Sequence, residues 1–315
     1  MCASDSFLLE PGTKAMLDDY AALYNAIDSL DNPDHVELTG EYFRSSFSYP
    51  SIEIGRDIVQ IKDSEGDLIA AGTIFSQNTS PPSSRVMVQV HPNYQKRGFG
   101  SIVLNHLFQT GRKNGARIFV CRIPTFRPDA ILFAERQGFK HEYSWIKMRL
   151  ECNKPPRPTV PPQDLILRGL DVGRELETWA HLQNAIYKDS HDYNEITVDS
   201  LKAQIKHHSF DPNLLVIGEV NGKPVGLCTG WSITPKKNEH KKNVLQIHGL
   251  GVLPEYRRNG YGQSLLFEVL NRAYIDGYDV SELVVDNTNQ AAISMYMKYG
   301  FQERYRHLWY KQEFL

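Results

Sequence analysis

The chain has 315 residues, of which 41% are hydrophobic and 23% charged, and its formal net charge is −2. This balance is ordinary for a soluble globular chain and supplies no basic field for nucleic acid or an anionic membrane. No apolar run approaches the roughly 18 residues of a spanning helix, the start lacks a signal-peptide pattern, and the four cysteines form no Cys-x-x-Cys pair. We therefore expect a cytoplasmic protein without a disulfide framework and without a bound metal.

Two halves of the chain carry the same glycine pattern. Gln-Lys-Arg-Gly-Phe-Gly at 95–100 corresponds to Arg-Arg-Asn-Gly-Tyr-Gly at 257–262, and Gly138-Phe139 corresponds to Gly300-Phe301. Both pairs share one offset of 162 residues (260 − 98 and 300 − 138). Each copy is long enough for a domain of about 150 residues, so we predict a duplicated fold. The predicted parts are a first domain at 1–152, a proline-rich linker at 153–163 and a second domain at 164–315.

The apolar spacing predicts the same elements in the same order in each half. A helix is followed by a hairpin, a strand that ends at the glycine pattern, a second helix, another strand and a helix that ends at Gly-Phe. This order predicts the α+β class, with two tandem domains that are each a mostly antiparallel mixed sheet flanked by helices. The first helix, the hairpin strands and the later strand fall at 21–27, 58–62, 69–75 and 118–121 in the first half, and at 180–186, 214–220, 225–231 and 282–285 in the second.

The turn at 257–262 has features of a phosphate site. A strand ends near Val252 and a helix starts around Gly262, and the first N–H groups of a helix are unpaired and lie at the positive end of its dipole. Gly260 lets the backbone bend toward a ligand. A Gly-x-Gly pair also occurs at helix starts that bind nothing. Leu265 stands where a dinucleotide fingerprint has its third glycine, so a Rossmann site is not predicted.

A longer motif set continues through the second half. Val-x-Pro-x-Tyr-Arg-x-x-Gly-x-Gly covers 252–262, and it is followed by Leu283-Val284-Val285, Asn289-Gln290-Ala291-Ala292, Tyr296 and Gly300-Phe301. The set resembles the GNAT superfamily of N-acetyltransferases, and the pairing of copies resembles the tandem acetyltransferases typified by mycothiol synthase. The resemblance implies acetyl-CoA as co-substrate and direct transfer of acetyl to a primary amine, on a small molecule or a peptide, in the second domain. The alternative is a non-catalytic protein that binds CoA as a sensor or scaffold.

The resemblance also assigns roles to residues of the second half. The cofactor's pantetheine arm would pair with the backbone where two strands separate, and its diphosphate would lie on the turn. Asn289 would contact the arm or cap the helix that starts at Gln290. Tyr296 would protonate the departing thiolate, or pack as an ordinary aromatic residue. The cofactor-binding residues implied in this way are Leu250, Gly251, Val252, Arg257, Arg258, Asn259, Gly260, Tyr261, Gly262, Gln263 and Asn289.

The general base is harder to place from the sequence. An acceptor ammonium must lose a proton before it attacks a thioester, and the family often uses a Glu on the strand before the turn. Gln246 and His248 stand on that strand instead. His248 is therefore the candidate base, although a histidine on a strand is more often packed or hydrogen-bonded. We expect the loops at 187–197 and 234–243 to shape the acceptor pocket.

The first half departs from the motif set at two positions. By the offset of 162, Ala134 stands where the second half has Tyr296, and Arg127 stands where it has Asn289. We therefore predict that the first domain is non-catalytic. The first half keeps the glycine turn. This turn either binds CoA or has only a structural role, in which its glycines allow the backbone to bend. The residues of this second possible cofactor site are Val90, Gln95, Lys96, Arg97, Gly98 and Gly100.

Overall fold

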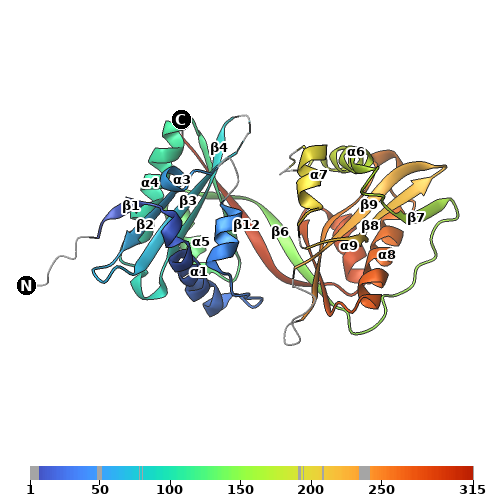
Figure 1. Cartoon of the computed structure of the whole chain (residues 1–315), viewed down its shortest axis with the longest axis horizontal. Coiled ribbons are helices and arrows are strands. Elements are labelled where there is room, and N and C mark those ends of the chain that lie inside the picture. Colours follow the sequence, from blue (N-terminus) through green and yellow to red (C-terminus); the bar gives the residue numbers. More distant parts are fainter. Residues whose placement is uncertain are drawn as a thin grey trace, which may run out of the picture. The chain divides into compact units, whose positions relative to one another are not determined.

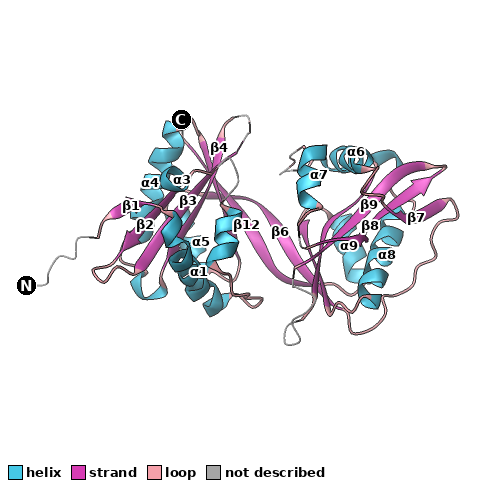
Figure 2. Ribbon diagram, in the orientation of Figure 1, coloured by secondary structure: helices cyan, strands magenta, loops and turns pink. Residues whose placement is uncertain are grey.

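The computed structural model describes residues 7–47, 52–77, 79, 81–190, 193, 195–207, 209–233 and 242–314. The chain divides into two compact units, which we call unit 1 (Met1–Ser144 with Arg306–Leu315) and unit 2 (Trp145–Tyr305). Each unit is a sheet flanked by helices (Figures 1 and 2). Among the helices of the described residues, none is both long enough and apolar enough to cross a membrane.

The sheet of unit 1 has the strand order β1-β2-β3-β4-β5-β12. All neighbouring strands run antiparallel except β4 and β5, which are parallel. The strands are β1 (Leu9–Pro11), β2 (Ile58–Lys62), β3 (Leu68–Gln77), β4 (Ser83–Val90), β5 (Ile118–Pro124) and β12 (Gln302–Glu313). The helices are α1 (Leu17–Asp31), α2 (Gly40–Ser46), α3 (Ile54–Asp57), α4 (Phe99–Lys113) and α5 (Pro128–Arg136), with single 3-10 turns at Lys14–Met16 and Pro92–Tyr94.

The sheet of unit 2 repeats this plan in the order β6-β11-β10-β9-β8-β7, with β10 and β11 as its parallel pair. The predicted fold class, two mostly antiparallel mixed sheets flanked by helices, is therefore confirmed. The strands are β6 (Lys140–Glu151), β7 (Leu165–Gly169), β8 (Phe210–Val220), β9 (Lys223–Ser232), β10 (Val244–Val252) and β11 (Val280–Asp286). The helices are α6 (Leu176–Tyr187), α7 (Val198–Gln204), α8 (Tyr261–Ile275) and α9 (Gln290–Lys298), with a 3-10 turn at Pro254–Tyr256.

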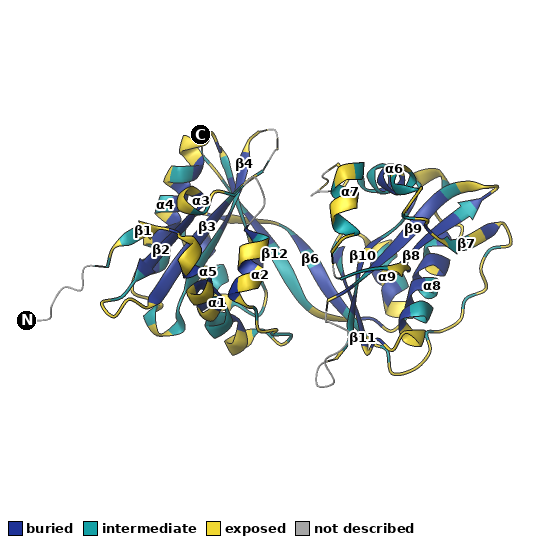
Figure 3. Ribbon diagram, in the orientation of Figure 1, coloured by how far each residue is buried: buried dark blue, intermediate teal, exposed yellow. Residues whose placement is uncertain are grey.

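The helix after each glycine pattern packs its apolar stripe on the sheet of its own unit, and the buried positions gather between the two layers (Figure 3). A strand glycine lies beneath each of these helices. A Cβ at Gly72 would lie 2.3 Å from Val103, and one at Gly226 would lie 3.0 Å from Leu265. Glycine at these positions lets the helix approach the strand closely. The stripes consist of Val103, Leu104 and Leu107 on α4 and Leu265, Leu266 and Val269 on α8.

One strand of each sheet comes from the other half of the sequence. In β12, residues 307–313 pair with β5, and Tyr310 is buried in the core of unit 1. In β6, residues 145–151 pair with β11, and Met148 is buried in the core of unit 2. The units therefore differ from the sequence boundaries at 152 and 163, because each exchanged strand finds its backbone partners and its apolar packing in the unit built by the other half.

Candidate active site

The two parallel strands of unit 2 separate at the level of Leu250. Their pairing ends where Ile247 lies opposite Leu283, whereas β10 continues to pair with β9 as far as Val252. A register shift between Ile247 and Gly249 disturbs β10 at the same level. The edge of β10 that faces β11 is therefore open over residues 250–252, the segment predicted to pair with a cofactor arm.

The end of α6 lies against this open edge. The Tyr187 hydroxyl donates to the Leu250 carbonyl at 2.9 Å and accepts from the Leu250 N–H at 2.7 Å. Gly251 allows the contact, because a Cβ there would lie 2.2 Å from Cγ2 of Ile186. Tyr187 was not predicted as a site residue and appeared only as the boundary of the loop at 187–197. No sequence motif identifies Tyr187, because its hydroxyl bonds to main-chain groups, which every residue carries whatever its side chain.

The turn after β10 has the backbone geometry of an anion site. Arg258 has φ 67° and Gly260 has φ 83°, both left-handed, and the corresponding residues of unit 1, Lys96 and Gly98, have φ 60° and 91°. Left-handed residues within a turn can direct successive N–H groups toward one concave side. A left-handed arginine or lysine is uncommon and sterically costly, and strained residues of this kind cluster at ligand-binding sites. The two turns thus share one geometry, as their shared sequence pattern predicts.

The predicted phosphate ligand Arg257 is engaged with the main chain. Its Nε donates to the Val252 carbonyl at 3.0 Å and its Nη2 to the Ile186 carbonyl at 3.5 Å. Gln95 repeats the first of these bonds in unit 1, where its Nε2 donates to the Val90 carbonyl at 3.2 Å. Both side chains therefore brace the end of a strand against the turn.

The other residues predicted for the turn lie at the start of α8. The Asn259 side chain donates to the Tyr256 carbonyl at 3.3 Å, and the Tyr261 hydroxyl donates to Asp164 at 2.6 Å. Gly262 lies over the strand end, because a Cβ there would lie 3.7 Å from Cγ2 of Val252. These side chains are engaged within unit 2, so the groups they leave for an anion are the first main-chain amides of the helix.

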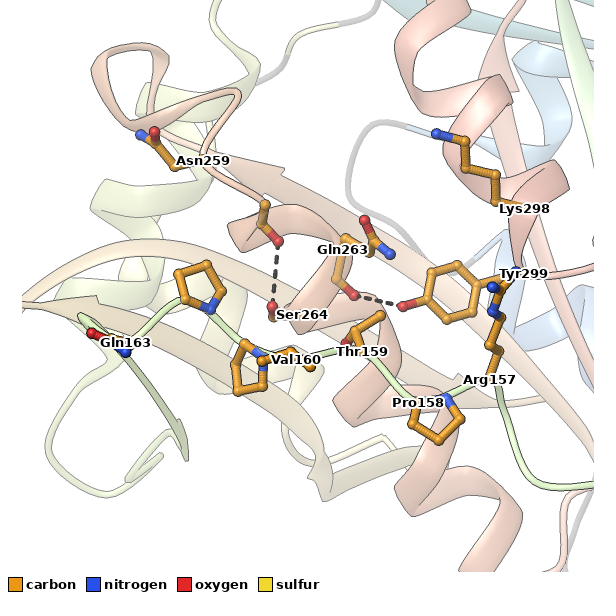
Figure 4. A pocket seen from close by; sticks show the side chains of 13 residues that line it. Arg157, Pro158, Thr159, Val160, Gln163, Asn259, Gln263, Ser264, Lys298 and Tyr299 are labelled. Carbon is orange, nitrogen blue, oxygen red and sulfur yellow. Dashed lines mark hydrogen bonds between the residues drawn. The ribbon is translucent and has the colours of Figure 1, made fainter.

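A cavity of 660 Å³ opens beside this turn (Figure 4). One wall is formed by linker residues 157–163, and Pro162 lies 3.6 Å from the Cβ position of Gly260. Another wall is the end of α9, where the Tyr299 hydroxyl donates to the Gln263 carbonyl at 3.2 Å. Arg157 and Lys298 add positive charge to the lining. The volume lies within the range of small-molecule sites. The linker was expected only to connect the two halves.

Helix α9 carries Asn289 and Tyr296. The Asn289 side chain accepts from the N–H of Ala292 at 3.1 Å and so caps the helix, which is one of its two predicted roles. Tyr296 is 7% exposed, and its ring lies 5.8 Å from that of Phe301. Burial raises the pKa of the Tyr296 phenol, and Tyr187 raises it further. The phenol is therefore protonated throughout the usual pH range.

Strand β10 has no Glu before the turn, but the neighbouring strand β11 carries one. Glu282 of β11 lies opposite Gln246 of β10 and is 5% exposed. It forms an ion pair with Lys147 of β6, and Arg149 lies 3.5 Å away. The carboxylate is thus engaged by two cations on the exchanged strand. No pattern in the sequence indicated this cluster, because its members come from different halves of the chain.

His248 lies at the irregular point of β10 and reaches solvent. Its ring lies 5.6 Å from the indole of Trp231. The protein packed around His248 lowers the pKa of its imidazole, and the positive charge of Lys147 lowers it further. The imidazole is therefore neutral near pH 7 and able to accept a proton.

Unit 1 keeps the turn but engages its cations differently. Lys96 lies 3.3 Å from Asp129, and the Arg97 guanidinium lies 5.1 Å from the centre of the Tyr94 ring. These contacts direct both cationic side chains toward the protein. A Cβ at Gly100 would lie 3.3 Å from the Phe133 ring and 3.7 Å from Val90, so the start of α4 is closely packed.

The loops expected to shape an acceptor pocket are only partly described. Residues 191, 192, 194 and 234–241 lie outside the described residues. Within the part of the chain that is described, no group of three or more His, Cys, Asp or Glu side chains is arranged to hold a metal ion.

A mixed sheet whose parallel strands separate beside a glycine turn, built twice in one chain, defines an acyltransferase of the tandem type. The chain belongs to the acetyltransferase (GNAT) family, which it matches over residues 24–139 and again over residues 176–301. It is an N-acetyltransferase with two GNAT domains, and the family resemblance drawn from its motifs is confirmed.

Relatives and solved structures agree with this assignment. The chain is 29% identical over 239 residues to a mycothiol acetyltransferase of Thermobispora bispora, covering 75% of this chain and 78% of that protein. A GCN5-related N-acetyltransferase from Sphaerobacter thermophilus superposes with a TM-score of 0.79 at 19% identity, covering 98% of this chain and 95% of the other. A tandem GNAT protein from the clavulanic acid biosynthesis pathway gives 0.76 at 14% identity, covering 98% of both. The predicted likeness to mycothiol synthase is confirmed, and the structural matches establish the fold.

Proposed function

We propose that unit 2 transfers the acetyl group of acetyl-CoA to a primary amine by direct attack. The observation that carries this proposal is the open edge of β10 at Leu250, which leads directly into the left-handed turn before α8. An extended ligand bound along that edge would bring its far end to the turn. Tyr296 and His248, the two candidates for proton transfer, belong to the same unit.

The groups around this edge fit the parts of an acyl-CoA. Its arm carries amides, which require one donor and one acceptor each, and Leu250 offers both from its main chain. The diphosphate requires N–H donors and positive potential, which the start of α8 provides. The cavity beside the turn, with Arg157 and Lys298 in its lining, has room and charge for a phosphorylated nucleoside.

The roles of the two proton-carrying residues follow from their surroundings. Acetyl-CoA supplies a thioester, an activated acyl group that a free amine can attack. Neutral His248 takes a proton from the acceptor ammonium, and the amine then forms its bond to the acyl carbon as the bond to sulfur breaks. Tyr296, which its raised pKa keeps protonated, donates to the departing thiolate. The new amide nitrogen then loses its extra proton, which restores the Tyr296 phenol.

We assign no chemistry to unit 1. Ala134, which stands at the position of Tyr296, is 3% exposed and packs in the core of unit 1. Because the relative from Thermobispora bispora is named for acetylation of mycothiol, we propose that the acceptor is a small-molecule amine.

Thiol release from acetyl-CoA, measured with a panel of small amines and peptides, tests this function. We expect release that depends on one class of amine and that falls sharply in Tyr296→Phe. Tight CoA binding by calorimetry, without release for any amine and without an effect of Tyr296→Phe, would instead show a sensor or scaffold. Absence of CoA binding at millimolar concentration would overturn both proposals.

A further inference from the structure

The Tyr187 hydroxyl occupies both main-chain groups of Leu250 at the point where β10 loses its neighbour. The distances of 2.7 Å from the Leu250 N–H and 2.9 Å to its carbonyl are those of two ordinary hydrogen bonds. Elsewhere in a sheet, such groups are taken by the next strand. Here β11 has already separated from β10 beyond Ile247. One side chain thus completes the backbone hydrogen bonding of an exposed strand edge.

A hydroxyl that donates and accepts at one residue imitates the two polar groups of a peptide unit. An amide of an extended ligand would present the same pair of groups, one N–H and one carbonyl, to Leu250. The Leu250 N–H is a single donor, so the Tyr187 hydroxyl and a ligand carbonyl cannot both bind it at full strength. The two occupants therefore compete for the same place.

We propose that Tyr187 is a positioning residue that stands in for the arm of acyl-CoA and must withdraw when the cofactor binds. This inference rests on the proposed function of unit 2. Without cofactor, the phenol keeps the Leu250 amide paired and correctly oriented, so this part-buried strand edge carries no unsatisfied group at Leu250. With cofactor, the arm replaces both hydrogen bonds and the end of α6 is released from β10.

A second contact connects this release to the phosphate turn. The Arg257 guanidinium, which adjoins the turn, donates to the carbonyl of Ile186, the residue just before Tyr187. A diphosphate on the turn attracts this guanidinium and weakens its bond to α6. Binding at the nucleotide end thereby favours withdrawal of Tyr187 at the acyl end.

The test is the variant Tyr187→Phe, with CoA affinity measured by calorimetry and melting temperature measured with and without CoA. Without CoA, the variant leaves Leu250 unpaired, so its melting temperature falls by several degrees. With CoA, that defect disappears, so CoA binds about five- to tenfold more tightly than to the unaltered chain, as expected for a net hydrogen-bond contribution near 1 kcal/mol. A residue with only a structural role would lower stability and leave affinity equal or weaker.

Tyr20→Phe in unit 1 is the matched control, because the Tyr20 hydroxyl is also buried and lies 3.2 Å from the Thr73 hydroxyl. It should lower the melting temperature without tightening CoA binding. Tyr187→Leu, which also lacks the hydroxyl, should change affinity in the same direction as Tyr187→Phe. CoA affinity that is unchanged or weaker in both Tyr187 variants overturns the stand-in role alone. No CoA binding by any of the proteins overturns the proposed function and this inference with it.

Discussion

Arg127 donates to Asp28 at 2.7 Å and so joins the start of α5 to α1 within unit 1. Both residues have counterparts at the candidate site of unit 2. Arg127 aligns with Asn289 by the offset of 162, and Asp28 aligns with Tyr187 by the offset of 159 that relates the two helices (180 − 21). Where unit 2 has a phenol on its strand edge and an amide capping a helix, unit 1 has an ion pair.

The first prediction concerns this ion pair. Asp28→Asn should lower the free energy of unfolding by about 2–3 kcal/mol, because Asp28 is buried and Arg127 is largely withdrawn from solvent. Asp31→Asn is the control, since Asp31 is more exposed and lies 3.3 Å from Arg127, and it should cost less than about 1 kcal/mol. Chemical denaturation measures both. Equal losses of unfolding free energy in the two variants would show that burial does not strengthen the pair of Arg127 with Asp28.

The second prediction concerns the proton donor. Tyr296→Phe should lower kcat by about 100-fold or more, because the departing thiolate loses its donor, while CoA affinity changes little. Steady-state kinetics and calorimetry separate these effects. Tyr274→Phe, on the exposed side of α8, should leave kcat unchanged. A kcat for Tyr296→Phe equal to that of the unaltered chain would remove this residue from the mechanism.

The third prediction is a pH dependence. The pKa of His248 lies below its usual value near 6.5, so kcat/KM should be constant near pH 7 and should fall as pH decreases through that lowered pKa. The free energy of unfolding should also fall as pH decreases, because the unfolded chain binds this proton more readily than the folded chain. The double variant Lys147→Met with Glu282→Gln removes the nearby cation without leaving its buried partner unpaired. The acidic limb of its pH profile should move upward, and an unmoved limb would rule out His248 as the base.

The fourth prediction identifies the unit that binds CoA. Gly260→Ala and Gly98→Ala place the same side chain at left-handed positions of similar φ in the two turns. Each should cost about 1 kcal/mol of stability through backbone strain. Only Gly260→Ala should weaken CoA binding and acetyl transfer, since we assign the active site to unit 2. If Gly98→Ala has the larger effect on CoA binding, the roles of the units are reversed.

Local patterns in the sequence were enough to predict the elements and the class of fold. The glycine pattern specified two bends, and both adopt the left-handed geometry that glycine permits, at Gly98 and Gly260. The apolar stripe of α8 follows from its spacing alone. The sequence could not assign the pairing of β12 with β5, because residues such as Ile118 and Glu313 meet across a long separation that no periodicity records.

The candidate site was predictable only where a motif names its residues. Asn289 was expected from its place in the motif, and the structure shows the capping bond that its side chain makes. Tyr187 was not predicted, because its partners are main-chain groups of Leu250. The linker composition predicted an extended segment, but not that Pro162 would lie against the turn at Gly260. Such contacts depend on packing in three dimensions.

The exchange of β6 and β12 has a consequence for synthesis on the ribosome. Unit 1 needs residues 306–315, which are translated only after all of unit 2, a delay of 162 residues from position 144 (306 − 144). At common elongation rates that delay lasts roughly 10–30 s. Throughout it the nascent chain carries an unfinished β5 edge, the kind of surface that invites aggregation. A product of either gene half alone would therefore lack the strand that closes its sheet in the full chain.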